Sequence, residues 1–319
     1  MHRRQGVEHL DQHIGNAGTG SIADMYNRAG SQYVLYADGD PDRLFCFEGL
    51  HAYADQRLWV VLERKLRELR ATGRSALRVL DAGCGPGTWL RRCVTHAYRL
   101  GFSQIAARGF DVAKVQIEAA RRMSVSLAAL TGVDLTFEVA DLTDRLPEAD
   151  GSVDLSLCLY SVLSHLPVPA LPQIAAEFAR IARGPFIATV RAIGSAPTAF
   201  IGSVEETRHL QLDHRRDRCE IELRTGRRTA VGFHLFTASE LRNCFGGYFR
   251  VEELSGLDIF HSRFALDRRW NPPSAVPDQA MLSRLADMEK ACANDPHFME
   301  HAMHLMLIGA PWALPEFGG

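Results

Sequence analysis

The chain has 319 residues, of which 46% are hydrophobic and 23% charged, a composition typical of a globular protein with one large domain and additions. Thirty-six basic and thirty-eight acidic side chains leave a formal net charge of −2, which disfavours a nucleic-acid partner. The seven cysteines show no C-x-x-C spacing, and the sequence has no signal core and no apolar run of about eighteen residues. We therefore expect a cytoplasmic protein with no membrane partner.

The first 71 residues predict a flexible tail, residues 1–20, followed by a helical cap, residues 21–71. Tyr26, Tyr33 and Tyr36 are spaced by seven and three residues, which places their rings on one face if the segment is helical. That face is either a core stripe or a lid that closes over a ligand.

From residue 72 to residue 191, strands and helices alternate as in a parallel sheet with helices on both faces. The expected strands are 78–81, 105–111, 135–140, 153–159 and 185–191, and the expected helices are 88–99, 114–126 and 172–182. Beyond residue 191 the pattern predicts a hairpin within 217–236, a capped helix from Thr237 to Phe245, a strand at 249–254, a helix at 279–293 and a strand at 304–309. The insertions 192–236 and 255–300 are expected to build a substrate pocket.

The turn after the first strand is the most informative segment. Residues 78–88 read RVLDAGCGPGT, an apolar strand, an acid and three glycines at alternate positions. Glycine lets a ligand approach the backbone at the carboxyl end of a strand, where open α/β sheets bind ligands. A dinucleotide site has its third glycine three residues after the second, whereas here the spacing is two. Asp81 would also repel a pyrophosphate, so the turn favours a cationic ligand.

The D-x-G-x-G-x-G pattern resembles the first motif of class I S-adenosylmethionine (SAM)-dependent methyltransferases. This resemblance implies a doubly wound, seven-stranded, mostly parallel Rossmann-like sheet whose last two strands are antiparallel. It implies that the acid and the turn hold the methionine end of SAM, that an acid ending the second strand binds the ribose, and that an acid after the third binds the adenine. The cofactor-binding residues expected on this basis are Tyr33, Asp81, Gly83, Gly85, Gly87, Asp111, Asp141, Leu142 and Leu159.

In small-molecule methyltransferases of this kind, the segment after the fourth strand passes beneath the sulfonium. Here that segment makes His165 a candidate general base or substrate-orienting donor, and Tyr160 a candidate wall of the methyl-transfer site. The alternative for His165 is a helix cap or a contact with the cofactor only. The candidate substrate-binding residues are Tyr26, Tyr36, Arg191, His234, His261 and Arg263. Arg191 could clamp a carboxylate or form a surface salt bridge, and the two histidines have structural alternatives.

The sequence lacks the motif of nucleic-acid amino methyltransferases and the acids of metal-dependent catechol methyltransferases, so no metal is expected. It therefore predicts a SAM-dependent methyltransferase that acts by SN2 transfer to an N, O or S atom of a small metabolite, with an amino acid or another carboxylate-bearing molecule preferred. The alternatives are a non-catalytic SAM-binding scaffold and an NAD-dependent oxidoreductase. The oligomeric state stays open, with a homodimer as one alternative.

Overall fold

The computed structural model describes residues 21–36, 43–47, 52–195, 207–223, 225–226, 228–261 and 279–312, with backbone alone at 29, 31–36, 207–210 and 223. The tail expected at 1–20, Arg263 and the side chains of Tyr33 and Tyr36 lie outside the described residues. No helix within these ranges is long and apolar enough to cross a membrane.

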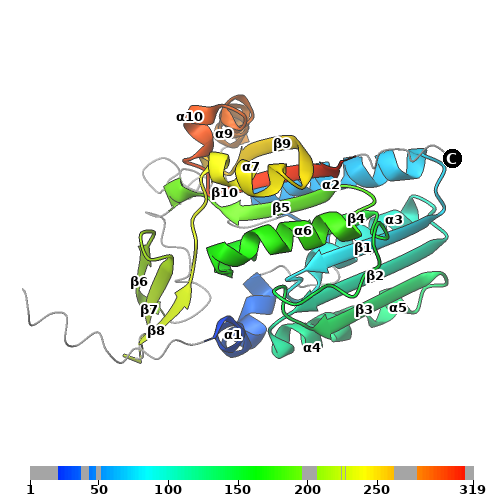
Figure 1. The fold of residues 1–319 in the computed structure, drawn as a ribbon, viewed down its shortest axis with the longest axis horizontal. Coiled ribbons are helices and arrows are strands. Elements are labelled where there is room, and N and C mark those ends of the chain that lie inside the picture. The colour runs from blue at the N-terminus through cyan, green and yellow to red at the C-terminus, as the bar shows by residue number, and fades with distance from the viewer. Residues whose placement is uncertain are drawn as a thin grey trace, which may run out of the picture.

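Seven described strands form one sheet with the order β3-β2-β1-β4-β5-β10-β9 (Figure 1). The parallel strands are β1 (Ala76–Ala82), β2 (Gln104–Asp111), β3 (Val133–Val139), β4 (Leu155–Cys158) and β5 (Phe186–Arg191). β10 (His304–Pro311) lies antiparallel between β5 and β9 (Phe249–Leu257). The doubly wound, mostly parallel sheet predicted from the sequence is therefore confirmed.

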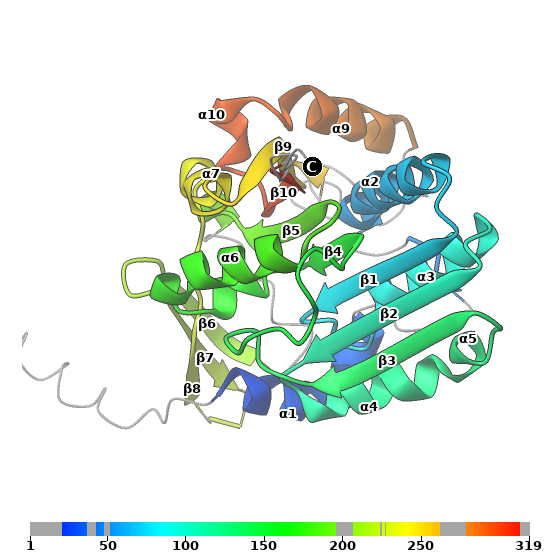
Figure 2. The same ribbon diagram turned by 45° about the vertical axis from the view of Figure 1, so that its right-hand side comes forward.

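Helices cover both faces of this sheet (Figure 2). The helices α2 (Ala52–Ala71), α3 (Thr88–Arg99) and α4 (Lys114–Met123) share one core, and α6 (Leu171–Ile181) and α7 (Ala238–Gly246) share the other. On β5, Phe186 and Ala188 enter the core beneath α6, whereas Ile187 between them enters the core beneath α3, because successive side chains of a strand alternate in direction. Both faces of the central strands β4 and β5 are thus buried, as is typical of doubly wound sheets.

α2 belongs to one of these helical layers. Leu58, Leu62 and Leu66 are fully buried against α3 and the sheet. Of the region expected to form a helical cap, α2 therefore packs into the core and α1 (Ile22–Tyr36) lies over the carboxyl ends of the strands.

α1 is interrupted at Gly30, whose φ of 53° and ψ of −132° are not helical. Helical periodicity does not continue through this residue, so the condition for placing Tyr26, Tyr33 and Tyr36 on one face, an unbroken helix, is not met. Only Tyr26, on the N-terminal side of the kink, has a described side chain.

A second, three-stranded antiparallel sheet is formed by β6 (Thr207–Asp213), β7 (Arg218–Leu223) and β8 (Arg228–Gly232). The predicted hairpin corresponds to β7 and β8, whereas β6 was not predicted. Figure 1 shows this sheet and α1 at the end toward which the arrowheads of the parallel strands point. The insertion after β5 therefore reaches the edge where ligands bind in open α/β sheets.

The remaining elements are short or peripheral. They are α5 (Val125–Ala128), α9 (Gln279–Cys292), α10 (Pro296–Met299) and the 3₁₀ helices η2 (Leu163–His165), η3 (Val168–Ala170) and η4 (Ile193–Ser195). The helix predicted at 114–126 is divided into α4 and α5 at Ser124. The capping box predicted at the start of α7 is present, with the Thr237 side chain accepting from the Glu240 N–H.

Candidate functional site

A cavity of about 580 Å³ lies at the carboxyl ends of β1 and β4, the point where the strand order reverses direction. Its walls come from the glycine turn, α1, the segments after β2, β3 and β4, and the small sheet. The sequence-predicted residues that line it are Tyr26, Asp81, Gly83, Gly85, Asp111, Asp141, Leu142, Leu159, Tyr160, His165 and Arg191. Segments far apart in the chain thus converge on one space.

Asp81 is a buried acid at the end of β1, with 2% of its surface exposed. Burial, with a further contribution from the nearby charge of Asp111, raises the pKa of this carboxyl to about 7. Its Oδ2 atom is buried and has no hydrogen-bond partner among the described residues. Because an unsatisfied buried carboxylate is costly, the atom fits a ligand that brings a cationic donor, such as an ammonium group.

The three glycines of the turn all have left-handed backbones, with φ values of 71° at Gly83, 52° at Gly85 and 76° at Gly87. A Cβ atom on Gly83 would stand 2.3 Å from Val162 Cγ2, and one on Gly87 would stand 2.7 Å from Phe137 Cε1. Gly87 does not line the cavity; it is the N-cap of α3. The turn therefore requires glycine for both its conformation and its close packing.

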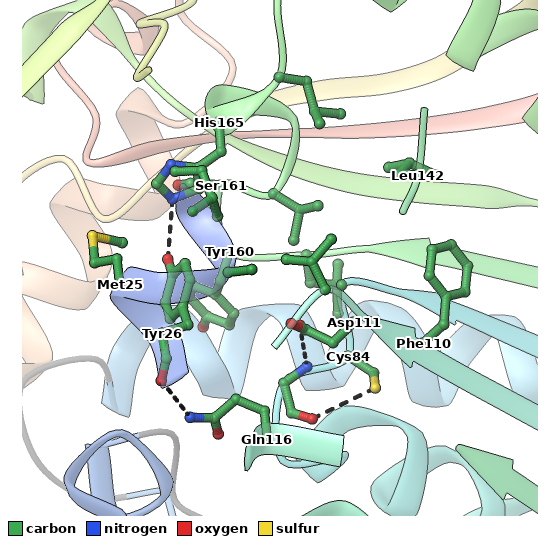
Figure 3. A pocket seen from close by; sticks show the side chains of 18 of the residues that line it. Met25, Tyr26, Cys84, Phe110, Asp111, Gln116, Leu142, Tyr160, Ser161 and His165 are labelled. Atoms are coloured by element: carbon green, nitrogen blue, oxygen red, sulfur yellow. Dashed lines mark hydrogen bonds between the residues drawn. The ribbon is translucent and has the colours of Figure 1, made fainter. Parts of the chain in front are cut away.

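Asp111 holds the glycine turn in place. Its Oδ2 accepts from the N–H of Gly85 at 3.0 Å (Figure 3), and its Oδ1 accepts from the N–H of Ala113 at 2.8 Å. Burial raises the pKa of the carboxyl, and these two hydrogen bonds oppose that effect. A carboxylate oxygen can accept more than one hydrogen bond, so Asp111 can also receive ligand hydroxyls.

Asp141 and Leu142 begin the loop that follows β3. The Oδ1 of Asp141 accepts from the backbone N–H of Thr143 at 2.9 Å and from its hydroxyl at 2.8 Å, and Leu142 is buried beside it. The local turn fixes the direction of the carboxylate, and the apolar neighbour offers a surface to a flat ring.

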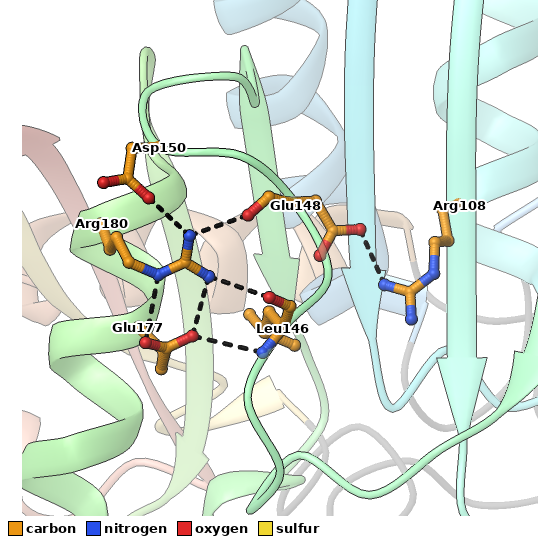
Figure 4. Close-up of polar contacts among 6 residues, drawn as sticks. All are labelled: Arg108, Leu146, Glu148, Asp150, Glu177 and Arg180. Atoms are coloured by element: carbon orange, nitrogen blue, oxygen red, sulfur yellow. Dashed lines mark hydrogen bonds and ion pairs between the residues drawn. The ribbon is translucent and has the colours of Figure 1, made fainter.

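Arg180 on α6 ties the same loop to the sheet (Figure 4). Its guanidinium donates to the backbone carbonyls of Leu146 at 2.9 Å and Glu148 at 2.8 Å, and it pairs with Glu177 and Asp150. The Glu148 side chain in turn pairs with Arg108 on β2. One side chain thus satisfies two loop carbonyls.

We expect Arg180→Ala to lower the free energy of unfolding by about 1–3 kcal/mol, since it leaves part-buried carbonyls without their donor. A chemical denaturation curve would measure the loss, and the exposed Arg122→Ala on α4 is the matched control. Equal stability of the two variants would show that the loop needs no such anchor.

Tyr160 and Ser161, directly after β4, have left-handed φ values of 50° and 69° although neither is glycine. The Tyr160 backbone N–H donates to Thr189 Oγ1 at 2.6 Å, and its hydroxyl donates to Asp55 at the start of α2. The Tyr160 ring contacts His304 edge-on with centroids 5.5 Å apart. Strained backbone held by surrounding contacts is typical of functional sites, and here it turns the Tyr160 ring into the cavity wall.

His165 ends η2 and lines the cavity. Its Nε2 lies 3.0 Å from the Tyr26 hydroxyl and its Nδ1 lies 3.3 Å from the Gly232 carbonyl oxygen. Burial lowers its pKa to about 4. The imidazole is therefore neutral at pH 7 and is a weak base there.

Arg191, at the end of β5, is 8% exposed and lines the cavity. Its Nε donates to Ser195 Oγ at 2.9 Å, which orients the guanidinium. A buried guanidinium in a cavity wall can receive a ligand carboxylate.

The two other predicted substrate histidines do not line the cavity. His234 lies between two carboxylates, with Nδ1 2.7 Å from Asp217 and Nε2 2.8 Å from Glu240. His261 stacks on Tyr53 with centroids 5.1 Å apart, and its backbone N–H donates to Glu289. The structural alternative therefore describes both histidines, because their partners hold them elsewhere.

Several cavity residues were not predicted from the sequence. Among them are Met25 on α1, Asp55 on α2, Trp89 on α3, Gln116 on α4, Cys219, Ile221, Val231 and Phe233 in or beside the small sheet, and His304 on β10. The alternating apolar residues of the hairpin were visible as a strand pattern. Which face of that hairpin lines the cavity depends on how the small sheet packs against the rest of the protein. The local sequence pattern does not predict this packing.

Residues 79–184 match the model of a family described as a methyltransferase domain. No curated protein matches the chain at a significant level. Among solved structures, the chain is similar to a SAM-dependent methyltransferase from Clostridium acetobutylicum, with 8% identity, coverage of 88% of this chain and 98% of that chain, and a TM-score of 0.50.

The chain is also similar to magnesium protoporphyrin IX methyltransferase from Synechocystis, with 16% identity, coverage of 88% and 96%, and a TM-score of 0.47. The family match runs from within β1 to just beyond α6, and it includes the acid-glycine turn, the acid that ends β2 and the acid that follows β3. Residues 79–184 are therefore a methyltransferase domain, and the chain has the fold of a SAM-dependent methyltransferase.

Proposed function

We propose that this methyltransferase acts on a small metabolite that carries a carboxylate, such as an amino acid. The observation that carries the proposal is that one cavity joins the buried, unsatisfied Asp81 to the buried guanidinium of Arg191. The Asp81 end suits a cationic methyl donor, and the Arg191 end suits an anionic acceptor.

In this proposal, each end of SAM has a residue suited to it. Asp81 and the glycine turn hold the ammonium of the methionine part, and Asp111 accepts from the ribose hydroxyls. Asp141 accepts from the adenine amino group while Leu142 lies against the ring. The fit is supported by the Asp81 Oδ2 atom, which is buried and has no hydrogen-bond partner among the described residues.

The acceptor side is lined by two kinds of side chain. Arg191, Tyr160 and His165 are polar, whereas Ile221 and Val231 of the small sheet are apolar. Arg191 holds the carboxylate of the acceptor, and the apolar wall receives its side chain. This division favours a compact, amphipathic molecule.

When bound, SAM supplies the electrophilic methyl group of its sulfonium. The protein supplies proximity and alignment, which in well-oriented reactions can be worth roughly 7–11 kcal/mol. Arg191 fixes one end of the acceptor, the Tyr160 ring forms a wall of the transfer site, and α1 covers the cavity and excludes water. The chemistry is an in-line displacement on carbon.

The test is a panel of amino acids with apolar side chains, each paired with its carboxamide, assayed with methyl-labelled SAM and mass analysis of the product. We expect methylation of the acids, and an increase of about 10- to 10²-fold in KM for Arg191→Gln, since a charged hydrogen bond contributes about 1.5–3 kcal/mol. The carboxamides should bind poorly to both enzymes. The exposed Arg250→Gln on β9 is the control, and an equal effect of Arg191→Gln on acids and carboxamides would refute the carboxylate contact.

A further inference from the structure

Tyr26 and His165 meet in the cavity although 139 positions separate them in the chain. Tyr26 comes from α1 and His165 from the segment after β4. The hydroxyl lies 3.0 Å from Nε2, and the two rings are perpendicular with centroids 5.7 Å apart. Figure 3 shows the pair beside Met25 and Ser161. α1 thus supplies a polar atom, the Tyr26 hydroxyl oxygen, at the place where the acceptor is proposed to bind.

The direction of this hydrogen bond follows from the other side of the imidazole. Nδ1 of His165 lies 3.3 Å from the Gly232 carbonyl, which can only accept, so Nδ1 carries the hydrogen. In a neutral imidazole the second nitrogen is then an acceptor. The Tyr26 hydroxyl must therefore donate its hydrogen to Nε2. With that hydrogen committed, the Tyr26 oxygen can only accept further hydrogen bonds.

The neutral state of His165 is supported by its surroundings. Burial lowers its pKa to about 4, and Phe233 contacts the ring edge-on with centroids 4.8 Å apart. The pair therefore offers an acceptor of hydrogen bonds and only a weak base.

Tyr26 is fixed on two sides. The Asn27 side chain accepts from the N–H of Val115 at 3.0 Å, and Gln116 on α4 donates to the Tyr26 carbonyl at 3.3 Å. On the other side, the buried Met25 packs in a cluster with Ile221 of the small sheet. The part of α1 that carries Tyr26 is thus anchored to α4 on one side and to the small sheet on the other.

Building on the proposed function, we propose that the methyl acceptor is an uncharged amine whose N–H donates to the Tyr26 oxygen, and that His165 is the positioning residue that orients this oxygen. An amine attacks through its lone pair while it keeps a hydrogen, so it needs an orienting acceptor. A thiolate keeps no hydrogen that could be donated to Tyr26, and a hydroxyl must lose its hydrogen to a base before it attacks. This selects nitrogen among the acceptor atoms N, O and S.

The α-ammonium group of the acceptor first loses one proton to water, which gives the uncharged amine, and no reactant other than water is needed. The nitrogen lone pair forms the N–C bond, the C–S bond breaks, and its electron pair stays on sulfur. The ammonium product then loses its proton to water. Tyr26 and His165 keep their own hydrogens throughout.

The first experiment offers the enzyme α-amino acids with apolar side chains together with the α-hydroxy and α-mercapto acids of the same skeletons. We expect methylation on nitrogen, and a fall of about 10²-fold in kcat for Tyr26→Phe, because misalignment of the reacting atoms carries a cost of that order. Affinity for S-adenosylhomocysteine, measured by calorimetry, should stay unchanged. A product methylated on oxygen or sulfur, or a Tyr26→Phe variant as active as the wild type, overturns the inference.

His165 variants separate positioning from base catalysis. In His165→Gln the amide oxygen can still accept the Tyr26 hydrogen, so we expect kcat within about tenfold of the wild type, whereas His165→Leu should lose about 10²-fold. Equal loss in both variants would make His165 a base and refute the positioning role. If His165→Leu does not fold, ¹⁵N NMR of histidine-labelled wild type decides, since a hydrogen on Nδ1 is required and one on Nε2 contradicts the assignment.

Failure of the proposed function gives a different result. In that case wild-type enzyme methylates no member of any series, whereas failure of this inference leaves an active enzyme that is insensitive to Tyr26→Phe or methylates another atom.

Discussion

Asp81→Asn is expected to weaken binding of S-adenosylhomocysteine by at least about 30-fold, the largest effect of any conservative change in the cofactor half of the cavity. Removing one partner of a buried charged pair costs about 2–5 kcal/mol, and each 1.4 kcal/mol is tenfold in affinity. Titration calorimetry measures the change, with the exposed Asp134→Asn as the control. Wild-type affinity in Asp81→Asn would show that the ammonium of the ligand binds elsewhere.

The same residue predicts a dependence of binding on pH. Burial raises the pKa of Asp81 to about 7, so in the proposed contact between the ligand ammonium and the Asp81 carboxylate, binding should release a proton below that pH. Affinity should therefore fall by about tenfold per pH unit below 7 and level off above it. Asp81→Asn should abolish this slope.

In the ligand-free protein, the effect of pH on folding stability has the opposite sign: stability falls as pH rises. The folded pKa lies above the unfolded value of 3.8, so the contribution of Asp81 to stability is present below that value and is lost as pH rises to about 7. The ligand-free Asp81→Asn variant should therefore melt higher than the wild type at pH 8, which a thermal scan can check.

Gly83→Ala should remove both stability and cofactor binding. The left-handed φ of 71° costs a non-glycine residue about 1–2 kcal/mol, and the new Cβ would stand 2.3 Å from Val162 Cγ2, which adds about 1–3 kcal/mol of overpacking. Thermal melting and calorimetry with S-adenosylhomocysteine would report the two losses.

The matched control for Gly83→Ala is Gly151→Ala. Gly151 has a similar left-handed φ of 58°, but a Cβ there meets nothing within 4 Å among the described atoms. It should show the conformational cost alone and bind the ligand normally. If both variants lose the same stability, the tight contact between the turn and Val162 has no energetic role.

The strands of the large sheet and the acids at their ends could be predicted because their signals are local. An apolar strand followed by Asp81, Asp111 or Asp141 is read from a few consecutive residues, and the alternation of elements places all three at one edge. The capping box at Thr237 was predictable for the same reason, since the residues that form it lie three positions apart.

The acceptor half could not be predicted in the same way because it is made by contacts between distant segments. Tyr26 reaches His165 across 139 positions, and Asp55 receives the Tyr160 hydroxyl across 105. His234 looked like a cavity residue from its place in the hairpin, but its hydrogen bonds to Asp217 and Glu240 hold it outside. Such pairs depend on the docking of α1, α2 and the small sheet, which no local pattern encodes.

The small sheet of β6, β7 and β8 shares no described strand pairing with the large one, yet it provides Ile221 and Val231 to the cavity. The proposed methyl-donor half and the proposed apolar acceptor wall are therefore built on two different sheets of the chain. Substitutions on β7 and β8 can reshape the range of accepted molecules while the acid-glycine turn stays as it is. On the proposed assignment of the apolar wall, acceptor choice can be altered by engineering or by divergence independently of the methyl donor.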